Sequence, residues 1–154
     1  MKRTVYLILL RGVGGKTQLP VQTLREKLAT AGFENVATYI NSGNAIVRSR
    51  LSRKMVIAKI AELCNAQFNF DKAIFARTLA EWEGLIARNP FAKVAADAPT
   101  TVHAALLENA PRTEDVESIR ACAVQGEDIK VIKGVAYLHT PNDFGRCNIA
   151  EKFD

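Results

Sequence analysis

Hydrophobic and polar residues in the first eighty positions follow two spacings, which predict alternating strands and helices. Residues 4–10 are apolar almost throughout, as is typical of a central strand. After Pro20, apolar residues recur at helical spacing until Gly32 ends the pattern. A second helix, capped by Ser52, carries the stripe Val56, Ile60, Leu63 and Cys64, and further strands are predicted at 36–40, 45–48 and 72–77. This order of elements is that of a ferredoxin-like split βαβ unit.

The same pattern begins again after residue 100. A capping box at 78–81 predicts a helix ending before Asn89-Pro90, and 92–99 has no periodicity and is interpreted as a linker. Residues 101–107 then resemble residues 4–10 in sequence, with identical residues at the first two and last two positions. They are followed by a helix capped by Thr113, a hairpin over 128–140 that turns at Lys133-Gly134, and a helical start at 149–153.

These elements predict an α+β protein of two ferredoxin-like lobes in tandem. The first lobe covers 1–79, a helix and linker cover 80–98, and the second lobe covers 99–154. The second lobe is incomplete if no strand follows its last helix.

Composition narrows the class of protein without naming an activity. The 154 residues carry a net charge of +5, which favours anionic partners such as a nucleic-acid backbone. No apolar run approaches the length of a membrane span. Cys64, Cys122 and Cys147 are odd in number and fit neither a disulfide framework nor a zinc site. We therefore expect a cytoplasmic protein with no membrane contact, no metal and no cofactor, in which Cys64 and Cys122 are buried thiols.

The most distinctive segment is a basic glycine loop, Leu10-Arg11-Gly12-Val13-Gly14-Gly15-Lys16. Glycines allow backbone N–H groups to line a concavity, and two cations would complete an anion pocket. A nucleotide P-loop is disfavoured, because Leu10 stands where the first glycine is needed. Pro20 also delays the helix, so Thr17 is not in its first turn. The loop is either an anion site or a basic connection without a ligand.

Other residues are weaker candidates for a ligand-binding or catalytic role. Ser42 and Asn44 lie in the predicted turn at 41–44, which needs no purpose beyond reversing the chain but exposes side chains for recognition. His103 and His139 each lie in a predicted strand, His139 near its end, and both are interpreted mainly as satisfied strand histidines. Arg146 and Cys147 lie in a second strand-to-helix loop, where an exposed thiol would be reactive only with a base beside it.

Aromatic residues bear on the nucleic-acid hypothesis. Ferredoxin-like RNA binders stack bases on aromatics of their central strands. Tyr6 is a candidate for such stacking, but residues 45–48 contain no aromatic. Backbone binding through charge is therefore favoured over base stacking.

Several motifs occur in an order that resembles one bacterial family. They are Leu10-Arg11-Gly12, Val13-Gly14-Gly15, Tyr39-Ile40-Asn41-Ser42-Gly43-Asn44, Asn89-Pro90-Phe91 and Leu138-His139-Thr140-Pro141. The chain resembles the domain-of-unknown-function family number sixteen-ninety-seven over nearly its whole length. The resemblance implies a cytosolic α+β fold of two ferredoxin-like halves and no assigned activity.

The chain departs from this family at two places. Its glycine loop is two residues shorter than in members of the family, and it reads Gly145-Arg146-Cys147-Asn148 where members read Gly-Arg-Ser-Lys. Members also continue into an Arg-Asn-Trp segment that does not occur here. The second lobe could then have an open sheet edge, and a homodimer formed through that edge is a hypothesis.

Three functions stay open. The leading one is non-catalytic binding of a phosphate-bearing ligand or a nucleic-acid backbone. The alternatives are an enzyme acting on a small phosphorylated or carboxylated substrate, with His139, Arg146 or Cys147 near the reacting centre, and a protein–protein interaction module. No catalytic residue is assigned, and an enzyme is the less favoured class. The candidate ligand-binding residues are Arg11, Gly12, Gly14, Gly15, Lys16, Ser42, Asn44, His139 and Arg146.

Overall fold

A computed structural model describes residues 2–14 and 17–152. The chain forms two compact units, here called unit 1 (residues 1–83) and unit 2 (residues 84–154). Both are mixed α and β, and their sheets are antiparallel. The α+β class predicted from the sequence is confirmed.

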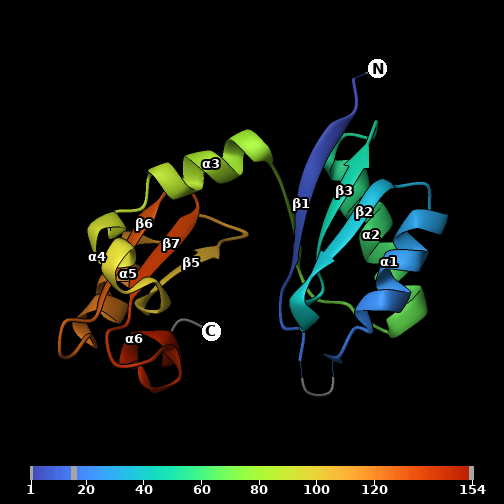
Figure 1. Ribbon diagram of the computed structural model, residues 1–154. Helices are drawn as coiled ribbons and strands as arrows, with labels where there is room; N and C mark the ends of the chain where they lie inside the picture. The colour runs from blue at the N-terminus through green and yellow to red at the C-terminus, as the bar shows by residue number, and fades with distance from the viewer. Residues whose placement is uncertain (1, 15–16, 153–154) are drawn as a thin grey trace. The chain divides into compact units, whose positions relative to one another are not determined.

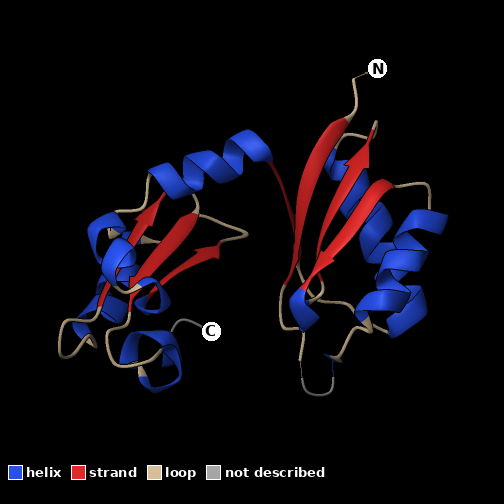
Figure 2. Ribbon diagram, in the orientation of Figure 1, coloured by secondary structure: helices blue, strands red, loops and turns tan. Residues whose placement is uncertain are grey.

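Unit 1 is built on a four-stranded sheet of order β2-β3-β1-β4. Its elements are β1 (Thr4–Leu10), α1 (Val21–Thr30), β2 (Glu34–Tyr39), β3 (Asn44–Ser49), α2 (Arg53–Phe68) and β4 (Ile74–Thr78). Helices α1 and α2 cover one face of this sheet (Figures 1 and 2). Every pair of neighbouring strands is antiparallel, so each helix connects two parallel strands with an antiparallel one between them.

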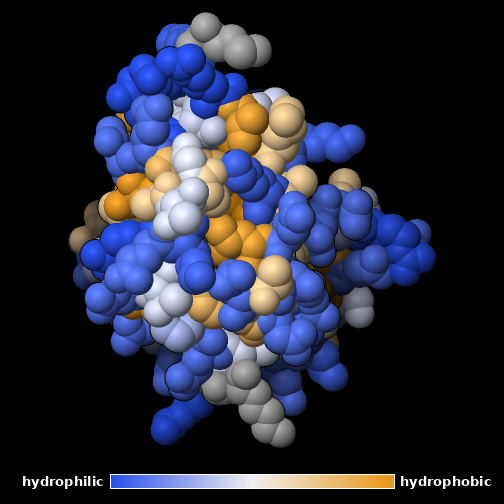
Figure 3. Space-filling model, turned by 90° about the vertical axis from the view of Figure 1, so that its right-hand side faces the viewer, coloured by the Kyte–Doolittle hydropathy of each residue, from blue (hydrophilic) through white to orange (hydrophobic). Residues whose placement is uncertain are grey.

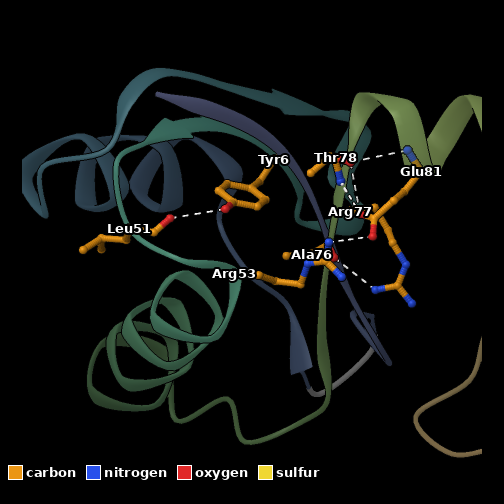
Figure 4. A network of polar contacts seen from close by, with 7 residues as sticks. All are labelled: Tyr6, Leu51, Arg53, Ala76, Arg77, Thr78 and Glu81. Carbon is orange, nitrogen blue, oxygen red and sulfur yellow. Dashed lines mark hydrogen bonds and ion pairs between the residues drawn. The ribbon is translucent and has the colours of Figure 1, made fainter. Parts of the chain in front are cut away.

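The core of unit 1 lies between this sheet and its two helices. Alternation along β1 places Tyr6, Ile8 and Leu10 on the buried face, where they pack with residues of α1 and α2, among them Leu24, Leu28, Val56 and Ile60. The proposal of Tyr6 as a base-stacking residue is therefore wrong. Its ring is buried, and its hydroxyl donates to the carbonyl oxygen of Leu51 at 3.2 Å (Figure 4).

Unit 2 contains a three-stranded sheet of order β5-β7-β6. Its elements are α4 (Ala92–Asp97), β5 (Val102–Leu106), α5 (Thr113–Ala121), β6 (Asp128–Ile132), β7 (Val135–His139) and α6 (Asn148–Glu151). Helix α3 (Leu79–Ala87) begins in unit 1 and continues into unit 2. The longest described helix, α2, has 16 residues, and none of the described helices is long and apolar enough to span a bilayer.

The central strand of unit 2, β7, is buried on both faces. Val135 and Tyr137 pack on one side with Leu85 and Phe91, and the Tyr137 hydroxyl donates to the Leu85 carbonyl at 2.7 Å. Ala136 and Leu138 point to the other side of the sheet, where they pack with Ile129, Cys147 and Ile149. This double burial explains why residues 135–138 read as a continuous apolar run.

Two local predictions need correction. The segment 92–99, interpreted as an irregular linker, contains helix α4. Phe91 and Val94 are three positions apart and pack on the Val135 and Tyr137 side of the sheet, so tertiary burial gives order to a segment with weak periodicity. Thr113 does not cap α5 but is its first residue, and the cap position is occupied by Arg112, which makes no side-chain cap.

The capping box at the start of α3 is confirmed and extended by an ion pair (Figure 4). The Thr78 N–H donates to Glu81 Oε2 at 2.8 Å, and the Glu81 N–H donates to Thr78 Oγ1 at 3.4 Å. Arg53, at the start of α2, donates to Glu81 Oε1 at 2.6 Å. Partial burial acts to raise the pKa of Glu81, but these donors outweigh it and lower that pKa. The start of α3 is thereby tied to α2 within unit 1.

Candidate functional site

The glycine loop leaves β1 after Leu10 and is anchored at both ends. The Arg11 N–H donates to the Ala73 carbonyl at 3.0 Å. Gly12 and Gly14 have φ angles of 68° and 152°, which glycine adopts readily and other residues rarely. The Thr17 hydroxyl lies within hydrogen-bonding distance of the carbonyl oxygens of both glycines. Two predicted ligand residues of this loop, Gly15 and Lys16, lie outside the described residues.

The turn between β2 and β3 packs against this loop. It forms a short 3₁₀ segment, η2 (Ile40–Ser42), followed by Gly43 in the left-handed conformation with φ of 75°. A Cβ at Gly43 would lie 3.3 Å from Leu19 Cδ1 and 3.4 Å from Val13 Cγ2, so any other residue would be strained by the angle and would fit tightly against these side chains. The two most specific sequence motifs of the chain are therefore neighbours in space.

A hollow of about 580 Å³ opens where the loop, the start of α1 and the turn meet. The described residues that line it are Gly14, Gln18, Leu19, Pro20, Val21, Gln22 and Asn41. Of the other predicted turn residues, Ser42 donates its hydroxyl to the Tyr39 carbonyl at 3.4 Å, and Asn44 is the first residue of β3. Both residues are half-buried, and the hydrogen bond of the Ser42 hydroxyl lies within the turn.

Ile40 is a conformational outlier beside this hollow. It has a φ of 47°, which is unfavourable for a β-branched side chain, and its side chain is 63% exposed. Tyr39, just before it, is 70% exposed. Neither side chain is buried, so their packing does not compensate for the backbone strain at Ile40.

We expect Ile40→Gly to raise the free energy of unfolding by about 0.5 kcal/mol. Glycine removes a left-handed strain of about 1–2 kcal/mol and loses part of that gain through unfolded-chain entropy. Urea denaturation of the full chain measures the change. Ile46→Gly in β3 is the control, because Ile46 is also exposed but extended, and there the same substitution should destabilise. A loss of stability in Ile40→Gly would contradict the expectation.

Charge is distributed unevenly between the two units. Residues 1–83 contain 13 Lys and Arg and 6 Asp and Glu, a net charge of +7, whereas residues 84–154 contain 8 and 10, a net charge of −2. The overall excess of +5 thus comes from the unit that contains the glycine loop. On the face drawn in Figure 3, hydrophilic residues cover much of the surface and hydrophobic residues reach it between them.

The remaining ligand candidates lie in unit 2. His139 ends β7, with its ring centroid 5.8 Å from that of Phe91. Arg146 is exposed in the short η4 segment (Phe144–Arg146). Neither belongs to the hollow of unit 1 as its described lining residues define it.

His103 is a satisfied strand histidine, as predicted. Its Nε2 lies 3.1 Å from Thr140 Oγ1, and its ring meets Phe144 edge-on at 4.6 Å between centroids. Burial lowers the pKa of His103, and the carboxylate of Asp143 acts against that effect. The imidazole is therefore favoured in its neutral form, which suits a structural contact.

Cys147 is buried, so its interpretation as an exposed thiol is wrong. Burial is the main cause that raises the pKa of its thiol, and neighbouring Glu127 raises it further. A protonated thiol is a poor nucleophile. Of the two cysteines predicted to be buried, Cys64 is buried, with its pKa raised to about 11, whereas Cys122 is only half-buried at the end of α5.

Glu127 is an organising residue that the sequence analysis missed. The residue is 9% exposed, and its carboxylate accepts hydrogen bonds from the N–H groups of Val124 at 3.3 Å and Asn148 at 3.2 Å. Burial acts to raise its pKa, but these donors and Cys147 outweigh it and lower that pKa. No periodicity or motif in the sequence marks a glutamate that accepts a hydrogen bond from the backbone N–H of a residue 21 positions further along the chain.

Comparison with known proteins supplies a family and a fold but no activity. The chain is similar in structure to "conserved bacterial protein SP0830 from Streptococcus pneumoniae", with a TM-score of 0.74 and 23% sequence identity over 90% of this chain and 78% of that one. No curated protein matches the chain. The family described as "Protein of unknown function (DUF1697)" matches residues 3–137. The chain is therefore a member of the DUF1697 family, as its glycine loop and its Tyr-Ile-x-Ser-Gly-Asn motif indicated.

Proposed function

We propose that this protein binds a small phosphate-bearing anion in the hollow of unit 1 and performs no chemistry on it. The observation that supports this most is the position of the hollow, where the glycine loop, the start of α1 and Asn41 meet. Its described lining contains no carboxylate that would repel an anion. The positive charge of unit 1 would concentrate anions around it.

The start of α1 strengthens the case for an anion. The first backbone N–H groups of a helix have no acceptor within the helix and carry a partial positive charge. In α1 no side chain caps these groups, because the cap position is Pro20, and the first turn has no acidic residue. Val21 and Gln22 of this turn line the hollow. A phosphate oxygen would supply the missing acceptor.

Arg11 is not among the described residues that line the hollow, but it begins the glycine loop that does, and it is proposed to pair with the bound anion. Gly15 and Lys16 keep that role as predictions. His139, Arg146, Ser42 and Asn44 are not needed by this proposal. The described residues that line the hollow include no histidine, cysteine, serine or carboxylate. That lining suits a binding site better than an enzyme, since most nucleophiles and general bases come from those residue types.

The proposal predicts saturable binding of inorganic phosphate or AMP that is lost when a negative charge enters the hollow. Gln18 is exposed and lines it, so Gln18→Glu should weaken binding at least tenfold by like-charge repulsion. Titration calorimetry at low salt, with each ligand added to the full chain, measures the dissociation constant.

Gln67→Glu is the matched control, because Gln67 is exposed on α2 and its change alters the net charge of unit 1 by the same amount. Gln67→Glu should leave the dissociation constant unchanged, apart from a small general effect. Arg11→Ala should weaken binding more than Arg50→Ala, another loss of one exposed cation. Equal effects of Gln18→Glu and Gln67→Glu, or no binding at low salt, would refute the site.

We also infer that each unit belongs to the ferredoxin-like class. In unit 1 the order β-α-β-β-α-β and the sheet order β2-β3-β1-β4 support that assignment. In unit 2 the order β-α-β-β-α supports the same class. A cytoplasmic location also remains part of the proposal, because it rests on the number and spacing of the cysteines.

A further inference from the structure

Unit 2 contains a hollow of its own, with a volume of about 430 Å³. It is bounded by the loop after β5 (residues 110–111), by α5, and by the end of β6 with the turn that follows it. Helix α5 lies against the hairpin of β6 and β7 (Figure 1), and Arg120 of α5 donates to the Ile129 carbonyl of β6 at 2.8 Å. A hollow of this size is large enough for a small metabolite.

This hollow occupies the same corner of its unit as the hollow of unit 1. In both units a strand is followed by a helix and then by two strands that a short turn joins. The third strand pairs with the first and with the second in each unit. Each hollow is lined by the loop after the first strand, by the following helix, and by the turn between the next two strands. The repeated fold therefore presents one corner twice, with different side chains in it.

Two charged side chains of the unit 2 hollow are available to a ligand. They are Glu117 of α5 and Lys133 of the turn between β6 and β7, and both are exposed. Among the residues that the structure describes, neither makes an ion pair or a side-chain hydrogen bond. The third charged residue of the lining, Arg120, is already engaged, because its Nε also lies 3.5 Å from Asp128 Oδ1. The hollow thus offers one carboxylate and one ammonium group.

Most of the remaining lining is apolar. Val116 of α5 and Val131 of β6 are half-buried, and the loop after β5 adds Ala110 and Pro111. Thr113 contributes a hydroxyl group. A ligand in this hollow therefore meets apolar surface as well as the two opposite charges.

We propose that this hollow binds a small zwitterion, an α-amino acid with an apolar side chain. The carboxylate of the amino acid pairs with the Lys133 ammonium group, and its ammonium group pairs with the Glu117 carboxylate. Its side chain contacts Val116 and Val131. Each pairing joins opposite charges, and a free amino acid carries both charges in one small molecule.

The charges of the hollow select this class over simpler ligands. Glu117 repels a phosphate, and Lys133 repels a polyamine. A purely apolar ligand would leave both charged groups partly desolvated and without partners. The proposal is independent of the anion site, because that site lies in unit 1 and its described lining contains no carboxylate.

Heteronuclear NMR of the isotope-labelled full chain tests the proposal, with L-leucine as the probe. L-leucine should shift the backbone amide signals of α5 and of the turn between β6 and β7 in a saturable manner. A ligand of this size has an expected dissociation constant of about 1–10 mM. Inorganic phosphate should leave these signals unchanged.

Two analogues of leucine separate the two charge contacts. The first is 4-methylpentanoate, which lacks the amine, and the second is 3-methylbutylamine, which lacks the carboxylate. Each should bind the native chain about threefold to fivefold more weakly than leucine, because exposed ion pairs contribute modestly. In Glu117→Gln the loss of the amine should no longer weaken binding, and in Lys133→Gln the loss of the carboxylate should no longer do so.

The matched controls are Glu151→Gln and Lys93→Gln, which remove one exposed charge each from other helices of unit 2. Both controls should retain the native preference for leucine over its analogues. The proposal is overturned if leucine shifts no signal in the hollow up to about 50 mM. It is equally overturned if loss of the amine weakens binding as much in Glu117→Gln as in the native chain. Since Glu117 and Lys133 are exposed, both variants should retain the native amide spectrum outside the hollow.

Discussion

Leu24→Ala should lower the free energy of unfolding of unit 1 by about 3 kcal/mol. Leu24 is fully buried in α1, within the core between the helices and the sheet. Truncation to alanine removes its transfer free energy and leaves a cavity that a packed core fills only in part. Because α1 also lines the hollow, a loosened helix should weaken anion binding in the same variant.

Urea denaturation followed by fluorescence measures this effect, since Trp82 is the chain's one tryptophan and lies in unit 1. Leu24→Met is the matched control, because it conserves volume and should cost less than about 1.5 kcal/mol. A loss below about 1 kcal/mol in Leu24→Ala would show that α1 does not depend on this contact. If a destabilised but folded variant kept its full affinity for the anion, anion binding would not depend on the packing of α1.

Glu127→Ala should cost unit 2 about 2–4 kcal/mol. The buried carboxylate accepts from Val124 and Asn148, and its removal leaves these backbone donors without their acceptor. It also removes the residue that links the start of α6 to the turn after α5. Thermal unfolding at neutral pH measures the loss, and Glu127→Gln, which keeps one acceptor oxygen, should lose less.

The contribution of Glu127 should also depend on pH with a defined sign. Its pKa is lower in the folded protein than its ordinary value of about 4.3. The unfolded state therefore binds a proton first as the pH falls, and the stabilisation is complete above about pH 4.3. It declines below that value and is lost as the pH falls through the folded pKa. The stability difference between the native chain and Glu127→Gln should shrink over this acidic range, and a difference independent of pH would contradict the assignment.

Patterns that depend on neighbouring residues were read correctly from the sequence. Strand β1 occupies residues 4–10 as predicted, because an apolar run of that length followed by a glycine loop is typical of a buried strand. The Ser52 side chain caps α2, accepting from the Met55 N–H at 3.4 Å. The Lys133-Gly134 turn joins β6 and β7, with positive φ at both residues. Each of these features is encoded within a few positions.

Features that depend on distant residues were missed or misread. Helix α4 forms because the sheet of unit 2 provides a surface for Phe91 and Val94. Tyr6 faces the core because the two helices of unit 1 cover that side of the sheet. Glu127 and Cys147 meet only after the chain between them has folded into the β6–β7 hairpin and the η4 segment.

The sequence by itself determined the α+β class, the order of strands and helices, the family and the distinctive glycine loop, because periodicity and motifs are local properties of a chain. Tertiary structure alone brought that loop against the Ser42-Gly43 turn, through the contact of Gly43 with Val13 and Leu19. It also decided which face of β1 is buried and left one edge of β5 without a described strand beside it. These outcomes depend on pairing between residues far apart in the chain, which no local pattern records.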